Sequence, residues 1–243
     1  MNIIKLDATA STNAHLRTML TTCCLENFTT IVTENQFAGK GQRGTTWVSE
    51  SGSNLTFSVL MKSKAETVQR IFDLNVMVAL AVATTLKKIA NLPFFIKWPN
   101  DILSGNKKIC GILIENSIKS TGEINSIVGI GINVNQTQFP AMSKASSLSL
   151  LTERIWDKEV LLHALLATLK EGYEALQRGE AKSIWEEYQA HLYRKEVVSA
   201  FEWPDGTRFN GRIKSVTPYG KLVVEVENQG ETEFDLKEIR LLY

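Results

Sequence analysis

The sequence predicts an α+β fold in which helices pack against a mixed β-sheet and a small β-barrel follows. Residues 66–90 are apolar on more than one face at helical spacing, as expected of a central helix, and β-like runs flank them. After residue 193 come five short β-like runs separated by turn residues, which is typical of an SH3-like barrel. We therefore expect one large domain over residues 1–193 and a barrel domain over residues 194–243.

Size and composition narrow the class of protein. The chain has 243 residues, of which 44% are hydrophobic, enough for a substantial core. A net charge of +1 disfavours a general nucleic-acid binder. Three cysteines form neither a disulfide framework nor a metal-ligand pattern. With no signal peptide and no apolar run long enough for a bilayer, these features predict a cytoplasmic protein without a membrane span.

The first third of the chain predicts three strands and a helix. Residues 3–6 and 29–34 have the composition of strands. Ser11 or Thr12 can cap a helix whose apolar positions run from Leu16 to Cys24. Residues 55–62 alternate apolar and polar side chains, which predicts a half-buried strand.

The remaining elements follow the same patterns. After the central helix we expect a hairpin with arms at residues 94–96 and 112–114, a strand at 124–134 and a loop at 135–149. Helices are expected at 157–177 and 180–192, with Gly179 as the stop between them. The barrel strands are predicted at 196–201, 207–215, 221–227, 231–235 and 238–242.

The hairpin carries the first candidate site. Its turn begins with Lys-Trp-Pro-Asn-Asp at residues 97–101, and Lys108 comes at the start of the second arm. A lysine beside a buried sheet is costly unless an anion compensates it, so two lysines at one turn indicate a pocket for a negatively charged ligand. A surface hairpin with solvated lysines is the alternative.

The second candidate site is a glycine-rich stretch at residues 39–47. Glycines at alternate positions let backbone amides turn toward an anion, and Lys40 and Arg43 add positive charge suited to phosphate. The stretch is neither a Walker A loop nor a Rossmann turn. A flexible surface loop is the alternative.

The order of these motifs resembles that of the biotin protein ligases. Gln36 precedes Gly39-x-Gly41-x-Arg43-Gly44-x-x-Trp47, then come the intact Lys-Trp-Pro-Asn-Asp, Lys108 to Gly111, and Gly-Ile-Gly-Ile-Asn ending at Asn133. The resemblance covers most of residues 7–135 and, more loosely, the barrel. It implies the catalytic domain that biotin and lipoate ligases share with class II synthetases. The residues alone predict only an anion-binding α/β pocket.

The resemblance also implies an activity and its partners. Such enzymes use ATP to convert biotin to biotinyl-5′-AMP, then transfer the biotinyl group to a lysine of a carrier domain. ATP, biotin and Mg²⁺ are thus the expected ligands, and the biotin carboxyl carrier domain of a biotin-dependent carboxylase is the expected partner. Larger relatives begin with a DNA-binding segment for which there is no room before Asp7, so no DNA partner is expected. A homodimer is compatible with exposed sheet edges.

The site residues implied by this resemblance match the family motifs one by one. Lys108 is the expected central catalytic group, with Lys40 and Arg43 assisting it, and Asp101 is the expected magnesium contact. Biotin and nucleotide are expected to be held by Ser11, Thr12, Asn13, Gln36, Gly39, Lys40, Gly41, Gln42, Arg43, Trp47, Lys97, Asn100, Lys108, Gly111 and Asn133. The family loop often carries arginine where this chain has Gln42, which predicts a more weakly held adenylate.

Two other functions stay open at this point. A lipoate ligase or octanoyl transferase loads a lysine by similar logic, and Cys110 could then serve as a thioester nucleophile. Its place in an apolar strand favours a packed core thiol instead. The second alternative is a non-catalytic biotin-binding regulator built on the same scaffold.

Overall fold

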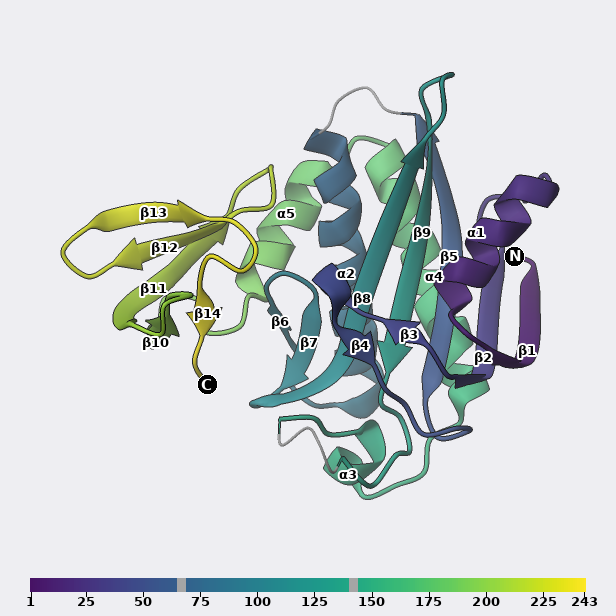
Figure 1. The fold of residues 1–243 in the computed structure, drawn as a ribbon, viewed down its shortest axis with the longest axis horizontal. Coiled ribbons are helices and arrows are strands. Elements are labelled where there is room, and N and C mark those ends of the chain that lie inside the picture. Colours follow the sequence, from purple (N-terminus) through teal and green to yellow (C-terminus); the bar gives the residue numbers. More distant parts are fainter. Residues whose placement is uncertain (65–68, 140–143) are drawn as a thin grey trace.

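Two β-sheets form the frame of the protein (Figure 1). A computed structural model describes residues 1–64, 69–139 and 144–243. The larger sheet has seven strands in the order β1-β2-β5-β9-β8-β7-β6, and only β1 and β2 run parallel, so the sheet is mixed as predicted. These strands are β1 (Ile3–Thr9), β2 (Thr30–Gln36), β5 (Leu55–Lys64), β6 (Phe95–Lys97), β7 (Asp101–Ser104), β8 (Lys107–Ile118) and β9 (Glu123–Ile132).

Helices cover both faces of this sheet. On one face, α2 (Gln69–Ala90) packs against α4 (Lys158–Gln177) and α5 (Ala181–Ala190). On the other face lies α1 (Thr12–Thr22), beside the small ribbon of β3 (Gly39–Lys40) and β4 (Thr46–Trp47) (Figure 1). The predicted start of the central helix, residues 66–68, lies outside the described residues.

Strand β5 differs from its predicted half-buried character. Residues 55–61 are buried on both sides of the sheet. Phe57 and Val59 belong to the core shared with α2 and α4, whereas Leu60 packs with Leu16 of α1. The apolar–polar alternation is present, but α1 covers the face that the pattern assigns to solvent.

The predicted hairpin contains an additional strand. Residues 101–104 form β7, which pairs with β6 on one side and with β8 on the other, and Gly105 turns the chain between β7 and β8 with a φ of +57°. Asp101 therefore begins a strand of its own. The Lys-Trp-Pro-Asn-Asp motif is the turn between β6 and β7, and Lys108 lies one strand further into the sheet.

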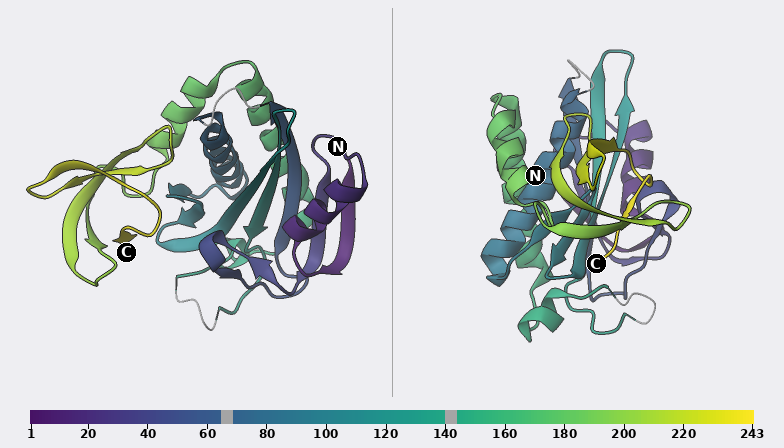
Figure 2. Two further views of the ribbon diagram at one scale, coloured as in Figure 1. Left: turned by 45° about the horizontal axis from the view of Figure 1, so that its top comes forward. Right: turned by 90° about the vertical axis from the view of Figure 1, so that its left-hand side faces the viewer.

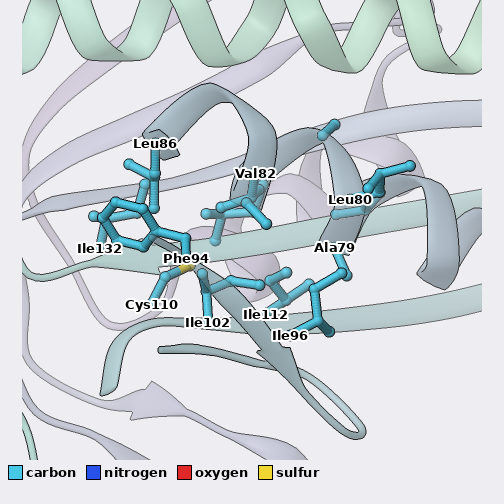
Figure 3. Close-up of a cluster of buried hydrophobic side chains, with 14 of the residues drawn as sticks. Ala79, Leu80, Val82, Leu86, Phe94, Ile96, Ile102, Cys110, Ile112 and Ile132 are labelled. Carbon is cyan, nitrogen blue, oxygen red and sulfur yellow. The ribbon is translucent and has the colours of Figure 1, made fainter. Parts of the chain in front are cut away.

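The buried sides of these strands meet α2 in a common apolar core (Figure 3). Cys110 lies in this core with Phe94, Leu86 and Ile132, and its side chain is fully buried. Burial raises the pKa of the Cys110 thiol, so the group stays protonated near neutral pH. The structure thus agrees with the prediction of a packed thiol.

Two smaller predictions were wrong. Cys23 and Cys24, expected on the apolar face of the first helix, are exposed because α1 ends at Thr22 and Cys23 is its C-cap. Part of the predicted 135–149 loop is helical, since α3 spans Leu148–Thr152 and Ser147 caps it through Leu150 N–H. Residues 140–143 of that loop lie outside the described part.

The five predicted barrel strands are all present. They are β10 (Val198–Glu202), β11 (Arg208–Val216), β12 (Leu222–Val226), β13 (Gly230–Phe234) and β14 (Arg240–Leu241), in the antiparallel order β13-β12-β11-β10-β14. This second sheet stands beside α5 and the β6–β7 end of the larger sheet (Figures 1 and 2). Among the described residues, no helix combines the length and apolarity needed to cross a bilayer.

Candidate active site

A cavity of about 540 Å³ lies where the larger sheet meets the C-terminal sheet. The helix α1, the β3–β4 ribbon, the β6–β7 turn and strands β8 and β9 supply one wall, and β10, β11, β12 and β14 supply the other. The predicted site residues that line it are Ser11, Thr12, Asn13, Gln36, Lys40, Gly41, Gln42, Trp47, Lys97, Asn100, Asp101, Lys108 and Gly111. Most of the predicted site is therefore gathered in one place.

Two lysines converge on one carboxylate in this cavity. Lys108 Nζ lies 2.6 Å from Asp101 Oδ1, and Lys97 Nζ lies 3.9 Å from Asp101 Oδ2. Strand register accounts for the Lys97 contact, because Lys97 faces Asp101 across β6–β7, whereas Lys108 pairs with Leu103 across β7–β8 and reaches Asp101 past a register shift between Ile102 and Leu103. The site carries more positive than negative charge at this point.

The surroundings of Lys97 disfavour the positive charge of its ammonium. Burial lowers the pKa of its ammonium, Asp101 opposes that shift, and the nearby Lys108 and Lys144 lower the pKa further. An incoming anion would relieve the repulsion among the three lysines. This cluster therefore has the charge to suit a ligand with several negative charges.

Lys144 and Tyr243 are part of this cluster, and the sequence analysis missed both. The Lys144 ammonium lies 4.0 Å from the centroid of the Tyr243 ring, and that of Lys97 lies 5.4 Å from it. Burial, together with the charge of Asp101, raises the pKa of the Tyr243 phenol to about 12. No local pattern marks either residue, since they come from segments far apart in sequence.

The Lys-Trp-Pro-Asn-Asp turn is fixed by hydrogen bonds from its neighbours. The Asn100 side-chain amide donates to the Ile112 carbonyl at 2.7 Å, and Ile112 N–H donates to the Asn100 carbonyl at 3.0 Å. Trp98 Nε1 donates to the carbonyl of Gly220, in a turn of the C-terminal sheet, at 2.9 Å. The motif thus joins the two sheets and holds its lysine in position.

Glycines of β8 and β9 form the floor of the cavity. A Cβ atom at Gly131 would lie 2.5 Å from Trp47 Cε2, and one at Gly111 would lie 3.0 Å from Trp47 Cζ3. The indole of Trp47 can lie against the sheet only because both positions lack a side chain. Its Nε1 is buried and has no hydrogen-bond partner among the described residues.

The glycine-rich stretch forms a short ribbon with a 3₁₀ turn, η1 (Gln42–Gly44), at its tip. The Gly41 amide donates to the Thr45 carbonyl at 2.7 Å, so in this arrangement the ribbon uses that donor internally. Gly39 does not line the cavity. A Cβ there would come within 2.6 Å of Gln36 Nε2, so this glycine lets the ribbon pack on Gln36.

A chain of hydrogen bonds forms the polar end of the cavity. Ser58 Oγ lies 2.7 Å from Thr12 Oγ1 and 2.6 Å from Asn13 Oδ1. Gln36 Oε1 accepts from Thr12 N–H at 2.9 Å. All four side chains are buried, and Ser11 completes the segment as the N-cap of α1.

Asn133, another predicted residue, stands apart from the cavity. Asn133 is buried and donates through its side chain to the Ser146 carbonyl at 3.0 Å, so it holds the segment that follows residue 143. The backbone of Arg43 lies in η1, but its side chain is outside the described part. Within the described part, no group of three or more His, Cys, Asp or Glu residues could hold a metal ion.

Comparison with known proteins agrees with this architecture. Residues 6–135 match the model of the biotin/lipoate A/B protein ligase family. The chain is 32% identical over 222 residues to the bifunctional ligase/repressor BirA of Bacillus spizizenii, covering 87% of this chain and 64% of that protein. It is 26% identical over 221 residues to a biotin–[acetyl-CoA-carboxylase] ligase of Mycobacterium tuberculosis, covering 90% of this chain and 81% of that protein.

A solved structure shares the whole fold. The biotin protein ligase of Aquifex aeolicus in complex with biotin and ATP superposes with a TM-score of 0.81 at 26% identity, covering 99% of this chain and 98% of that one. The predicted catalytic domain with an SH3-like C-terminal sheet is thereby confirmed. The protein belongs to the biotin/lipoate A/B protein ligase family.

Proposed function

We propose that the protein is an ATP-dependent biotin protein ligase, which forms biotinyl-5′-AMP and transfers biotin to a lysine of a biotin carboxyl carrier domain. The observation that carries this proposal is the convergence of Lys97 and Lys108 on Asp101 in a cavity that ends in the polar chain at Thr12. The Aquifex relative, which binds biotin and ATP, supports it independently.

The chemistry requires two anions to meet. The carboxylate of biotin must approach the α-phosphate of ATP, and charge builds up on the phosphate oxygens as the carboxylate–phosphorus bond forms and the bond to the departing pyrophosphate breaks. Lys108 is the central catalytic group because its ammonium sits on the sheet floor, where it can stabilise that charge. Lys97 and Lys144 neutralise the remaining phosphates.

The substrate carboxylate competes with Asp101 for Lys108. In the described arrangement Asp101 compensates the lysine charges and keeps both side chains directed into the cavity. A bound acyl and phosphate group can take over this compensation. The ion pair thus preorganises the lysines before the reacting groups arrive.

The polar end of the cavity suits the ureido head of biotin. A cyclic urea presents N–H donors beside a carbonyl acceptor, and the pocket needs both kinds of group. Thr12 and Gln36 are the buried residues that offer them. Ser11 and Asn13 hold this segment at the start of α1.

The β3–β4 ribbon closes over the intermediate. Lys40 is exposed and lines the cavity, so its ammonium can reach a phosphate or the biotin carboxylate. Arg43 is expected to assist it. The Trp47 ring covers the glycine floor, where it shields the adenylate from water and offers its unpaired Nε1–H.

The residues present fit a magnesium ion that accompanies ATP. Magnesium needs few protein carboxylates when phosphate oxygens and water complete its shell. Asp101 Oδ1 is taken up by Lys108, whereas Oδ2 lies 3.9 Å from Lys97 and can turn to a cation. Magnesium would neutralise phosphate charge at this carboxylate. Asn100 shapes the turn that presents it.

The two domains meet near residue 193 in this proposal. The last helix before the boundary ends at Ala190, and β10 begins at Val198. Tyr193 N–H donates to the Ile96 carbonyl at 2.8 Å, so the linker is tied to the edge strand β6. The C-terminal sheet contributes a cavity wall, through which it can contact nucleotide or the carrier domain.

The alternative transferase route is disfavoured by the position of Cys110. Its thiol points into the apolar core, on the face opposite the cavity residue Gly111, and its pKa is raised. A thioester nucleophile must reach the substrate as a thiolate.

Biotin-dependent exchange of labelled pyrophosphate into ATP tests the proposal. We expect exchange in the wild-type chain and a loss of at least about 100-fold in Lys108→Ala, the scale seen when one donor to a developing charge is removed. Lys107→Ala, which changes the adjacent lysine of β8, is the matched control and should retain exchange. A wild-type chain that binds biotin without catalysing exchange would favour the regulator reading.

A further inference from the structure

Glu115 contacts the polar end of the site without lining the cavity. Its Oε2 lies 2.8 Å from Asn13 Nδ2, and its Oε1 lies 2.5 Å from Arg17 Nη2. It follows Gly111 and Leu113 at alternate positions of β8, so its side chain is on the cavity face of the sheet. This regular spacing is the sequence signal that could have identified it.

The acceptors around Asn13 determine which way its amide faces. A carboxylate accepts hydrogen bonds and cannot donate them, and the same holds for the Leu113 carbonyl, 3.3 Å from Asn13 Nδ2. The NH₂ group of Asn13 must therefore face Glu115. Its Oδ1 consequently faces Ser58, 2.6 Å away, and Ser58 has to donate to it.

A hydroxyl has a single hydrogen, and this limits the hydrogen bonds that Ser58 and Thr12 can donate. Ser58 Oγ is the donor to both Asn13 Oδ1 at 2.6 Å and Thr12 Oγ1 at 2.7 Å, so its one hydrogen is shared between two acceptors. The Thr12 hydroxyl gives its own hydrogen to Gln36 Oε1 at 3.3 Å. Thr12 presents only lone pairs to the cavity.

We propose that Glu115 is a positioning residue that sets the direction of this hydrogen-bond chain and so makes Thr12 an acceptor for a urea N–H. The inference rests on the proposed function, since it concerns the ureido end of biotin. Glu115 touches no substrate atom. It acts through Asn13 and Ser58, and removing it leaves the 3.3 Å contact with the Leu113 carbonyl to orient the Asn13 amide, so the chain is held less firmly in the direction that makes Thr12 an acceptor.

Gly129 provides a second line of support. A Cβ at this position would lie 2.3 Å from Asn13 Oδ1, and the three atoms nearest to it all belong to Asn13. The Asn13 amide is thus held between the bare backbone of β9 and the Glu115 carboxylate. Gly129→Ala would displace this amide and is expected to reproduce the effect of losing Glu115.

The test compares two glutamates of the same hairpin. Glu115 and Glu123 both lie in the β8–β9 hairpin, both form an ion pair with a basic residue, and their side chains are 32% and 34% exposed. We expect Glu115→Ala to raise the dissociation constant for biotin by about ten- to a hundredfold, measured by calorimetry. Glu123→Ala should bind as wild type does.

Two readouts separate positioning from a loss of folding. The KM for ATP and the melting temperature of Glu115→Ala should stay close to those of Glu123→Ala. A parallel loss of biotin affinity, ATP affinity and melting temperature would overturn the proposal. Equal biotin affinity in the two alanine variants would overturn it as well.

A rescue experiment tests the requirement for an acceptor. Glu115→Gln has one oxygen for two donors, Asn13 and Arg17, so its biotin affinity should fall. Arg17→Met removes the competing donor from a half-exposed ion pair and should change little alone. The double variant Glu115→Gln/Arg17→Met should regain most of the affinity. A double variant as weak as Glu115→Ala would contradict the role of the acceptor.

Failure of the proposed function gives a different result from failure of this inference. A wild-type chain that does not bind biotin overturns both. A wild-type chain that binds biotin and exchanges pyrophosphate, while Glu115→Ala matches it in biotin affinity, overturns only the positioning role.

Discussion

Lys108 and Asp101 form the closest ion pair of the candidate site, with 2.6 Å between Lys108 Nζ and Asp101 Oδ1. The two residues lie on the neighbouring strands β7 and β8, so the sheet fixes their separation. Lys97 contacts the same carboxylate from β6, the strand on the other side of β7. The Asp101 carboxylate therefore positions two ammonium groups, and its removal should affect both lysines.

Asp101→Asn should move the alkaline limb of pyrophosphate exchange to lower pH. Burial already lowers the Lys97 pKa below its usual value of 10.5, and Asp101 partly restores it. Without the carboxylate charge the pKa falls further, so the ammonium is lost earlier as the pH rises. A pH profile of exchange measures this shift. A limb that stays in place, or that moves to higher pH, would contradict the electrostatic coupling.

Cys110→Ala should retain pyrophosphate exchange and biotin transfer. The thiol is fully buried among apolar side chains, so its loss leaves a small cavity that costs about 1–2 kcal/mol of unfolding free energy. Urea denaturation measures the stability change and carrier biotinylation measures the activity. Transfer abolished in a variant that is still folded would restore the thioester route.

Gln42→Arg should slow the release of biotinyl-5′-AMP by about tenfold, the effect of one charge-assisted hydrogen bond of modest strength. Gln42 lines the cavity at the start of η1 and lacks a charge that could hold a phosphate. A chase of bound adenylate with unlabelled ligand measures the release rate. Gln42→Met, similar in length but uncharged, is the control, and equal rates in the arginine variant and the wild type would refute the prediction.

Gly131→Ala should weaken the retention of adenylate because its methyl group displaces the Trp47 indole. Gly111→Ala should have a smaller effect, since its Cβ would lie 3.0 Å from the ring rather than 2.5 Å. Tryptophan emission and the adenylate release rate report the displacement. In a Trp47→Ala background Gly131→Ala should add little, and full additivity would disprove the shared cause.

Local patterns predicted most of the fold. The N-cap at Ser11, the C-terminal sheet and the long helices depend on short-range signals, and they were identified from sequence. Strand β7 was missed because its four residues lie between two turns. The burial of β5 on both faces was missed because it depends on where α1 docks.

The candidate site was predictable only where a motif marked it. Lys97, Asp101 and Lys108 share one turn region, so their meeting follows from the hairpin. Lys144 and Tyr243 reach the same place through long-range packing, which no local pattern encodes. The Gly41 amide shows the opposite case, since the pattern of a nest was present but the ribbon uses that donor internally.

The most direct test of the catalytic role proposed for Lys97 and Lys108 is to detect the product, biotinyl-5′-AMP. The wild-type chain is mixed with biotin, ATP and magnesium, and the protein-bound small molecules are identified by mass spectrometry before and after a biotin carboxyl carrier domain is added. We predict that biotinyl-5′-AMP accumulates first and then disappears as one carrier lysine gains biotin. A chain that binds biotin and ATP yet never forms the adenylate would contradict the account.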